Sequence, residues 1–160
     1  MMIGVAVVLI SSKIRSGQDS DQNRKSLEGI LTNHQLALLS YDVVTDDRQT
    51  ISHQLLTLCE TTRPHIILTL GGTGIRPTDW APEATRDVIE KEIPGIGEAM
   101  RAESLKKVRT AMLSRGTAGI KGATLIINLP GSVKGVQENL DVVLPLLEHM
   151  VEKMGSMATS

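Results

Sequence analysis

Aromatic residues are nearly absent from this sequence: it contains no Phe, one Trp and one Tyr among 160 residues. The core must therefore be built from Ile, Leu, Val, Met and Ala. Proteins that hold single-stranded nucleic acid stack successive bases on aromatic side chains, and the sequence has no residues for such a platform. We therefore expect no nucleic-acid partner.

Cysteine is also scarce. The single cysteine, Cys59, excludes an intrachain disulfide, and its apolar setting in LLTLC is typical of a small core residue in a reducing compartment. The apolar run MMIGVAVVLI has no basic leader and is shorter than the roughly 20 residues that span a bilayer. We expect a cytoplasmic protein without membrane contact, in which this run is a buried strand.

The charge is nearly balanced, at −1, with 41% hydrophobic and 22% charged residues. This composition is typical of a globular protein, and any recognition of an anion must be local. The length suits one domain, which we place at residues 1–154. The small polar residues of GSMATS, at 155–160, predict a flexible C-terminal tail.

Apolar periodicity predicts strands that alternate with helices. The predicted strands are 3–10, 41–45, 65–70, an edge strand within 111–120, and 124–129; the predicted helices include Leu27 to Leu38, Ile51 to Cys59, Pro82 to Ile93, a segment from Ile96, and a segment from Ser132 that Pro145 kinks or splits. Such alternation favours parallel pairing with right-handed crossovers. The sequence therefore predicts an open, mostly parallel α/β sheet with helices on both faces.

Ligands of open α/β sheets bind beyond the carboxyl ends of the strands. In this sequence those ends carry polar and glycine-rich segments: Ser11-Ser12-Lys13, Asp46-Asp47, Gly71-Gly72-Thr73-Gly74 and Pro130-Gly131-Ser132. Because these ends meet at one edge, we expect them to form a single binding rim.

The Gly-Gly-Thr-Gly turn allows two interpretations. Bare backbone N–H groups between a strand and a helix can cradle a phosphate, or the turn can be a tight connection without a ligand. The spacing matches neither nucleotide fingerprint, because Pro77 occupies the third glycine position of G-x-G-x-x-G and no G-x-x-x-x-G-K-[ST] occurs.

Two carboxylates are expected near this turn: Asp46 at a neighbouring strand end and Asp79 just before the start of the following helix. Carboxylates tolerate a bound phosphate when a cation bridges the two, and Mg²⁺ prefers such oxygen ligands. The alternative is that Asp79 caps the following helix. Ser114, Arg115 and Lys134 add groups that suit an anion, although each alone is more often a solvated surface residue. The four histidines show no metal-ligand spacing.

Several ordered motifs extend this pattern over nearly the whole chain: TLGGTGIRPTDWAPEAT, IPGIGEAMR, AMLSRGTAGIKG and LIINLPGSVKGVQENL. Together they resemble the MoaB/Mog family of molybdenum-cofactor biosynthesis, which includes molybdopterin adenylyltransferases. The resemblance implies a three-layer α/β/α fold, a homo-oligomer that is a trimer or a hexamer, and a pterin site at the strand ends. It also implies that ATP and the terminal phosphate of molybdopterin react with Mg²⁺ present, giving adenylylated molybdopterin and pyrophosphate.

Residue roles carried over from the family fall on the same rim. Asp46 and Asp79 are expected to hold Mg²⁺ and to be catalytic; the expected ligand-binding residues are Ser11, Ser12, Gly71, Gly72, Thr73, Gly74, Ser114, Arg115, Pro130, Gly131, Ser132 and Lys134.

The chain also departs from the family pattern at the rim. The differences are Ser12 for Asp, residues 21–24 (Asp-Gln-Asn-Arg) for Asp-Thr-Ser-Gly, Leu70 for Thr, Ala81 for Thr, and Val133 for Pro. The residue changes at Ser12, Arg24 and Ala81 keep two alternatives to catalysis open. One is a noncatalytic oligomer that binds a pterin or nucleotide, and the other is a structural trimer with a vestigial site.

Overall fold

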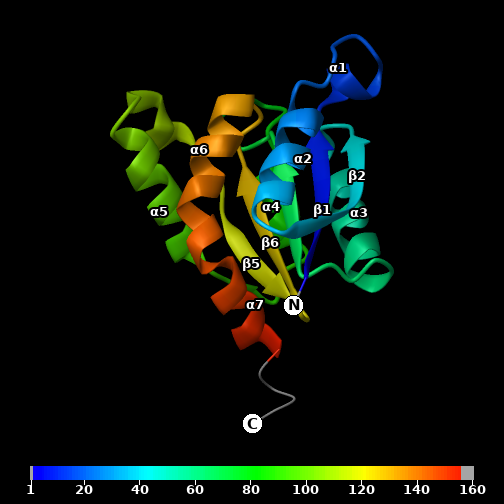
Figure 1. Ribbon diagram of the computed structural model, residues 1–160. Helices are drawn as coiled ribbons and strands as arrows, with labels where there is room; N and C mark the ends of the chain where they lie inside the picture. Colours follow the sequence, from blue (N-terminus) through cyan, green and yellow to red (C-terminus); the bar gives the residue numbers. More distant parts are fainter. Residues whose placement is uncertain (1, 156–160) are drawn as a thin grey trace.

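The sheet and its helices are seen in a computed structural model, which describes residues 2–155 (Figure 1). The strands are β1 (Ile3–Ile10), β2 (Leu36–Val44), β3 (Ile66–Leu70), β4 (Lys91–Glu92), β5 (Ala118–Lys121) and β6 (Thr124–Leu129). The helices are α1 (Ser12–Arg15), α2 (Asn23–Asn33), α3 (Arg48–Glu60), α4 (Ala81–Arg86), α5 (Pro94–Leu105), α6 (Val133–Val143) and α7 (Leu147–Gly155), with 3-10 turns η1 (Arg109–Leu113) and η2 (Leu144–Leu146).

The six strands form one sheet in the order β2-β1-β3-β6-β5-β4. The first four are parallel to one another, and β5 and β4 are antiparallel to their neighbours. The predicted α/β fold with an open, mostly parallel sheet is therefore confirmed.

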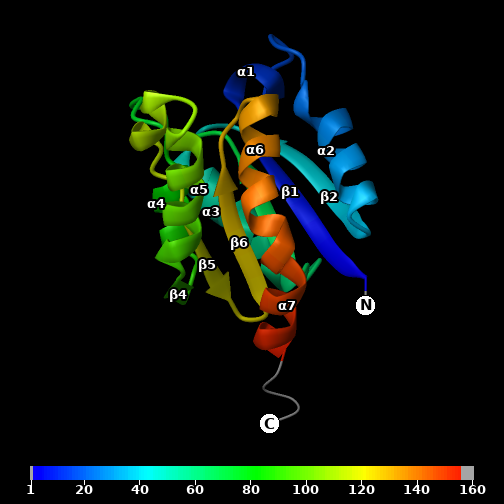
Figure 2. The ribbon, with the colours of Figure 1, turned by 60° about the vertical axis from the view of Figure 1, so that its left-hand side comes forward.

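Strand β1 is buried over all eight residues, as its continuous apolar run predicts. Val5 and Val7 face a core formed with α2, α5, α6 and α7, whereas Ala6 and Val8 face a second core formed with α3 and α4. Figure 2 shows these two helical layers on opposite sides of the sheet. The expected three-layer α/β/α arrangement follows from this division.

The register brings the strand ends level at one edge. Ile10 pairs with Val44 of β2, while Leu70 of β3 lies between Leu9 of β1 and Leu129 of β6. The segments that follow these residues start side by side, which is the arrangement that the sequence predicts for the rim.

The second strand begins earlier than predicted. We expected Leu38 on a helix, but α2 ends at Asn33 and Leu38 lies within β2. The chain reverses at Gln35, which adopts a left-handed φ of 58°. The apolar spacing from Leu27 continued through this reversal, so periodicity alone could not detect it.

The prediction of one helix from Pro82 to Ile93 was wrong at its C-terminal end, because α4 ends at Arg86 and β4 follows. Pro94 starts α5 rather than stopping a helix, since proline suits the first helical position. The ambiguous segment 111–120 contains η1 and then β5, which is covered at the sheet edge by β4.

The predicted split at Pro145 is confirmed, because η2 separates α6 from α7. Gly155 closes α7, and the remainder of the predicted tail, residues 156–160, lies outside the described residues. Within residues 2–155, no helix has the length and apolar character needed to cross a bilayer.

Candidate functional site

Two glycine turns meet at the level ends of β3 and β6. We call residues 71–74 and 130–132 together the glycine rim. Gly71 has φ 94°, and a Cβ there would lie 2.8 Å from the Ile10 carbonyl oxygen. A Cβ on Gly131 would lie 3.4 Å from the Gly71 Cα. The absence of side chains at both positions allows three strand ends to approach one another at the rim.

Gly72 links the rim to the start of α4. Its φ is 73°, and the Ala81 N–H donates to the Gly72 carbonyl at 3.0 Å. A Cβ on Gly72 would lie 3.3 Å from the Ala81 Cβ, and Ala81 is fully buried. The small residue at 81, where the family usually has Thr, therefore packs directly beneath the turn.

The carboxylate of Asp79 closes its own loop. Its Oδ2 accepts from the Arg76 N–H at 3.0 Å and lies beside Gly74, whose Cβ would come within 2.8 Å of it. The N-terminus of α4 has Trp80 at its cap position and no side-chain cap hydrogen bond. The alternative interpretation of Asp79 as a helix cap is therefore wrong. Its Oδ1 has no hydrogen-bond partner among residues 2–155.

Ser12 fixes the position of Asp46. The Ser12 hydroxyl donates to Asp46 Oδ1 at 2.7 Å, and the Asp46 backbone N–H donates back to Ser12 Oγ at 3.1 Å. Asp46 Oδ2 makes no hydrogen bond within the described part of the chain. A hydroxyl at position 12 thus holds the carboxylate without adding a second negative charge beside it.

Arg115 clasps the loop that carries Asp79. Its Nε donates to the Gly74 carbonyl at 2.7 Å, one terminal nitrogen donates to the Asp79 carbonyl at 2.9 Å, and the other pairs with Glu83. Its backbone N–H also donates to the Thr73 carbonyl at 2.7 Å. The guanidinium is thus occupied by protein groups, so the structure shows it positioning the loop, whereas its expected contact with a ligand stays a prediction.

Glu83 completes this clasp from the first turn of α4. Burial raises the pKa of its carboxyl, but the hydrogen bond and charge of Arg115 outweigh burial and hold that pKa below its ordinary value. The pair is therefore ionised at neutral pH.

The serines of the rim act locally as helix caps. Ser11 Oγ accepts from the Ile14 N–H at 3.2 Å, and Ser132 Oγ accepts from the Gly135 N–H at 3.0 Å. Each hydroxyl keeps its own hydrogen for another acceptor, such as a phosphate oxygen. Lys134 is exposed and its Nζ lies 3.9 Å from Glu138, so its expected contact with a ligand stays a prediction.

Sequence reasoning did not identify Asn23 and Asn128. The Asn23 side-chain amide donates to the Gly131 carbonyl at 2.7 Å, which ties α2 to the rim. Asn128 is buried and bonds to Thr69, Thr85 and the Thr117 N–H beneath the rim. A buried polar residue inside the apolar run TLIINL was the available signal, since such residues require hydrogen-bond partners.

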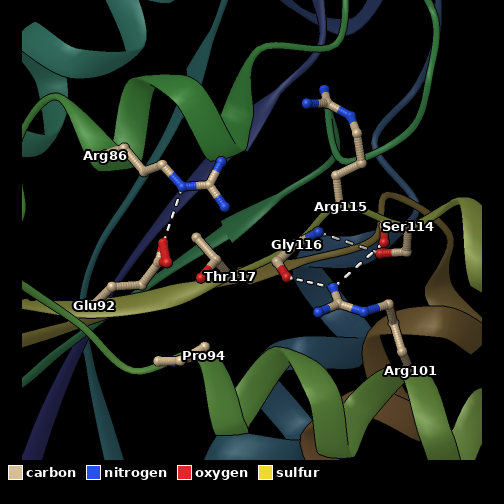
Figure 3. A pocket seen from close by; sticks show the side chains of 8 residues that line it. All are labelled: Arg86, Glu92, Pro94, Arg101, Ser114, Arg115, Gly116 and Thr117. Carbon is tan, nitrogen blue, oxygen red and sulfur yellow. Dashed lines mark hydrogen bonds and ion pairs between the residues drawn. The ribbon is translucent and has the colours of Figure 1, made fainter.

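A cavity of about 320 Å³ adjoins this region (Figure 3). Its lining includes Ser114 and Arg115, which are predicted ligand residues, and also Gly116 and Thr117, which are not. Arg86 and Arg101 also line it, and sequence reasoning assigned no function to either.

Trp80 lies at the start of α4 with an exposed ring, and the Arg48 guanidinium lies 6.0 Å from the ring centroid.

Among residues 2–155, no group of three or more His, Cys, Asp or Glu side chains could hold a metal ion. Any cation at the rim would therefore depend on ligand oxygens as well as on protein carboxylates.

The sequence profile of a family described as "Probable molybdopterin binding domain" matches residues 6–149. The molybdopterin adenylyltransferase of Helicobacter pylori strain J99 is 39% identical over 152 residues, which cover 94% of this chain and 86% of that protein. The chain belongs to the MoaB/Mog family. The molybdopterin adenylyltransferase of Escherichia coli K12 is 37% identical over 141 residues, covering 87% of this chain and 72% of that protein.

Solved structures of the MoaB/Mog family share this architecture. The molybdopterin biosynthesis enzyme MoaB from Thermus thermophilus superposes with a TM-score of 0.90 at 38% identity, covering 96% of each chain. The resemblance stated from the sequence motifs is thus confirmed for both family and fold, whereas the roles of individual rim residues stay predictions.

Proposed function

We propose that this protein is a molybdopterin adenylyltransferase of molybdenum-cofactor biosynthesis. Its substrates are ATP and molybdopterin, and its products are adenylylated molybdopterin and pyrophosphate. The observation that carries the proposal is the glycine rim, where the bare turns after β3 and β6 lie at the same sheet edge as the β2 end that precedes Asp46, and the β3 turn continues into the loop of Asp79. Relatives that are 37–39% identical over most of this chain are named for the same activity.

The reaction needs positioning more than acid–base chemistry. A terminal phosphate oxygen of molybdopterin attacks the α-phosphorus of ATP, the new P–O bond forms, and the bond to the β-phosphate oxygen breaks to release pyrophosphate. The phosphate nucleophile is already anionic near neutral pH, so the site must align two anions and reduce their repulsion. Backbone N–H groups of residues 72–74 and the hydroxyls of Ser11 and Ser132 suit this task, whereas the Gly71 N–H already donates to the Leu129 carbonyl at 3.0 Å.

The rim carboxylates fit Mg²⁺ as a partner of the phosphates. Asp46 and Asp79 each have one carboxylate oxygen without a protein hydrogen bond in the described chain, and hard oxygen ligands suit this ion. When bound, Mg²⁺ would neutralise negative charge on the triphosphate. Ser12 and the Arg76 N–H hold the two carboxylates in place through their other oxygens.

Pyrophosphate release from ATP tests the proposal. Purified protein with ATP and Mg²⁺ should release pyrophosphate only when molybdopterin is added, since the acceptor phosphate is the nucleophile. Release at the same rate without molybdopterin, or no release with it, would contradict the proposed activity.

The second candidate is a noncatalytic protein that binds the pterin or nucleotide. The replacement of Asp by Ser12 favours it, because Ser12 supplies no carboxylate beside Asp46. This candidate predicts saturable binding of molybdopterin or ATP by calorimetry without any pyrophosphate release. A structural trimer with a vestigial site predicts no saturable binding of either.

The proposal includes a homo-oligomer, either a trimer or a hexamer. Its support is an exposed apolar patch on the end of α5, on η1 and on the link between them, formed by Leu105, Val108, Met112 and Leu113. A second copy of the chain would remove this surface from water.

The proposed location is the cytoplasm, in keeping with the free Cys59, whose thiol pKa is raised by burial.

A further inference from the structure

The cavity shown in Figure 3 lies between α4, β4 and α5, on the far side of residues 114–117 from the Asp79 loop that Arg115 clasps. Its volume of about 320 Å³ falls at the lower end of the roughly 300–1,000 Å³ of small-molecule pockets. Two arginines from different helices, Arg86 and Arg101, extend toward it.

Arg101 is held rigidly by one edge of its guanidinium. One terminal nitrogen donates to the Gly116 carbonyl at 2.7 Å and to the Ser114 carbonyl at 3.3 Å. The plane rests on Gly97, where a Cβ would lie 3.2 and 3.3 Å from its two terminal nitrogens. Its other terminal nitrogen and its Nε donate to no group within residues 2–155, so this edge of the fork is available to a ligand.

Arg86 is anchored in a similar way at the end of α4. Its Nε donates to Glu92 at 2.9 Å, while its two terminal nitrogens have no partner in the described chain. Figure 3 shows this guanidinium beside Thr117, a residue of the cavity wall. Two free donor edges therefore border one cavity.

The charge of the cavity suits an anion. Arg86 and Arg101 contribute two positive charges and Glu92 one negative charge, which leaves one positive charge. The Arg115 side chain does not alter this balance, because it points away from the other two arginines in Figure 3 and pairs with Glu83.

We propose that Arg86 and Arg101 form a binding site for a phosphate-bearing anion, separate from the glycine rim. Planar guanidinium forks bind phosphate oxygens in pairs, and anchoring one edge of each fork reduces the entropy lost when the other edge binds. The site does not require the proposed transferase reaction, because Arg86 and Arg101 belong to neither the predicted catalytic nor the predicted ligand-binding residues. Ser114 and Arg115, which also line the cavity, do belong to the predicted ligand-binding residues. Thr117 is positioned to supply a hydroxyl to the same anion.

Calorimetric titration with inorganic pyrophosphate tests this site at low ionic strength without ATP or molybdopterin. Wild-type protein should bind pyrophosphate saturably, and Arg86→Gln should weaken binding about tenfold or more, because charge-assisted hydrogen bonds are lost. Arg48→Gln is the matched control, since Arg48 is also an ion-paired arginine on this side of the sheet, with an exposure of 46% against 48% for Arg86. Arg48 lies outside the cavity lining, so the Arg48→Gln protein should bind pyrophosphate with wild-type affinity.

Backbone amide shifts in nuclear magnetic resonance spectra locate the bound anion. Shifts at Gly116 and Thr117 on adding pyrophosphate would support the proposal, whereas shifts confined to Gly72 and Thr73 would place the anion at the rim and overturn it. No saturable binding by wild type, or equal affinity of wild type and Arg86→Gln, would also overturn it. A failure of ATP turnover would contradict only the proposed transferase activity, because the pyrophosphate titration involves no reaction.

Arg101→Lys provides a second variant that keeps the charge but loses the planar fork. It should weaken pyrophosphate binding as Arg86→Gln does, and far-ultraviolet circular dichroism checks that the fold persists without the bonds to Ser114 and Gly116. A folded Arg101→Lys protein with wild-type affinity would contradict the role of the Arg101 fork.

Discussion

At the scale of single residues, the geometry of the Asp79 loop depends on Arg115. Its guanidinium bridges the carbonyls of Gly74 and Asp79 and the carboxylate of Glu83, which lie at two ends of one loop and on the following helix. A planar side chain with donors in fixed directions can satisfy all three acceptors together. The loop that carries the predicted catalytic carboxylate is thus fixed by a residue from another part of the sequence.

We predict that Arg115→Lys lowers the free energy of unfolding by about 1–3 kcal/mol, because a lysine ammonium cannot reach three separated acceptors. Urea denaturation followed by circular dichroism measures the change. Arg48→Lys is the control, since its pair with Asp87 is exposed and should contribute less than about 1 kcal/mol. Equal losses of unfolding free energy in the two variants would contradict this role of Arg115 in holding the Asp79 loop.

The ion pair between Arg115 and Glu83 also predicts that the stability of the fold depends on pH. The pKa of Glu83 is lower in the folded protein than its ordinary value of about 4.3, so the ionised pair stabilises the fold above that ordinary value. This contribution is lost as the pH falls through the lowered folded pKa. The stability difference between wild type and Glu83→Gln should therefore be full at neutral pH and shrink in acid. A difference that grows on acidification would contradict this assignment.

At the scale of elements, the rim depends on the close approach of three strand ends. Gly71 combines a positive φ with the contact of its missing Cβ to the Ile10 carbonyl, which belongs to the backbone and cannot rotate away. Gly122 also has a positive φ, of 59°, but open space surrounds the position of its missing Cβ. The two glycines separate the cost of a left-handed backbone from the cost of a clash.

We predict that Gly122→Ala costs about 1 kcal/mol, from the left-handed conformation alone, and that Gly71→Ala costs roughly 2 kcal/mol more. Thermal or urea unfolding of both variants measures the two losses. Similar losses for the two variants would mean that the Ile10 contact does not constrain the rim.

The sequence was sufficient for elements whose signals are local. The apolar runs of β1, β3 and β6 and the break at Pro145 each depend on neighbouring residues, and these elements were predicted. The start of β2 and the end of α4 were not, because a left-handed Gln35 and a two-residue pairing of β4 with β5 are set by the tertiary fold.

At the scale of the whole molecule, the exposed apolar patch on α5 and η1 is the surface that the proposed oligomer would bury. Leu105, Val108, Met112 and Leu113 gather there, whereas Leu146 is exposed on η2 at the other end of α6. Comparing a substitution in the patch with one at Leu146 therefore separates a specific interface from the general exposure of apolar side chains.

We predict that Met112→Lys shifts the protein toward a monomer in sedimentation velocity, because a buried lysine would lack a partner at the interface. Leu146→Lys is the control, with an exposed fraction of 55% against 62% for Met112, and should leave the assembly unchanged. A monomeric wild type, or a Met112→Lys protein with wild-type sedimentation, would contradict the proposed interface.

The candidate site could be predicted from the sequence only as a set of positions. The strand-end rule grouped Ser12, Asp46 and the glycine turns, and the structure brings their segments to one edge. The partners of each side chain could not be predicted, because Arg115 meets Glu83 across 32 residues and Asn23 meets Gly131 across 108. Such contacts depend on how the layers pack.

The most direct test of the central claim follows the α-phosphate of labelled ATP. Wild-type protein with molybdopterin and Mg²⁺ should transfer that label to molybdopterin and release unlabelled pyrophosphate. Asp79→Asn should lower the transfer rate at least about a hundredfold while keeping the fold, whereas Asp141→Asn, an exposed carboxylate on α6, should react like wild type. Label that stays in ATP with wild-type protein, or an Asp79→Asn variant with unchanged transfer, would contradict the account.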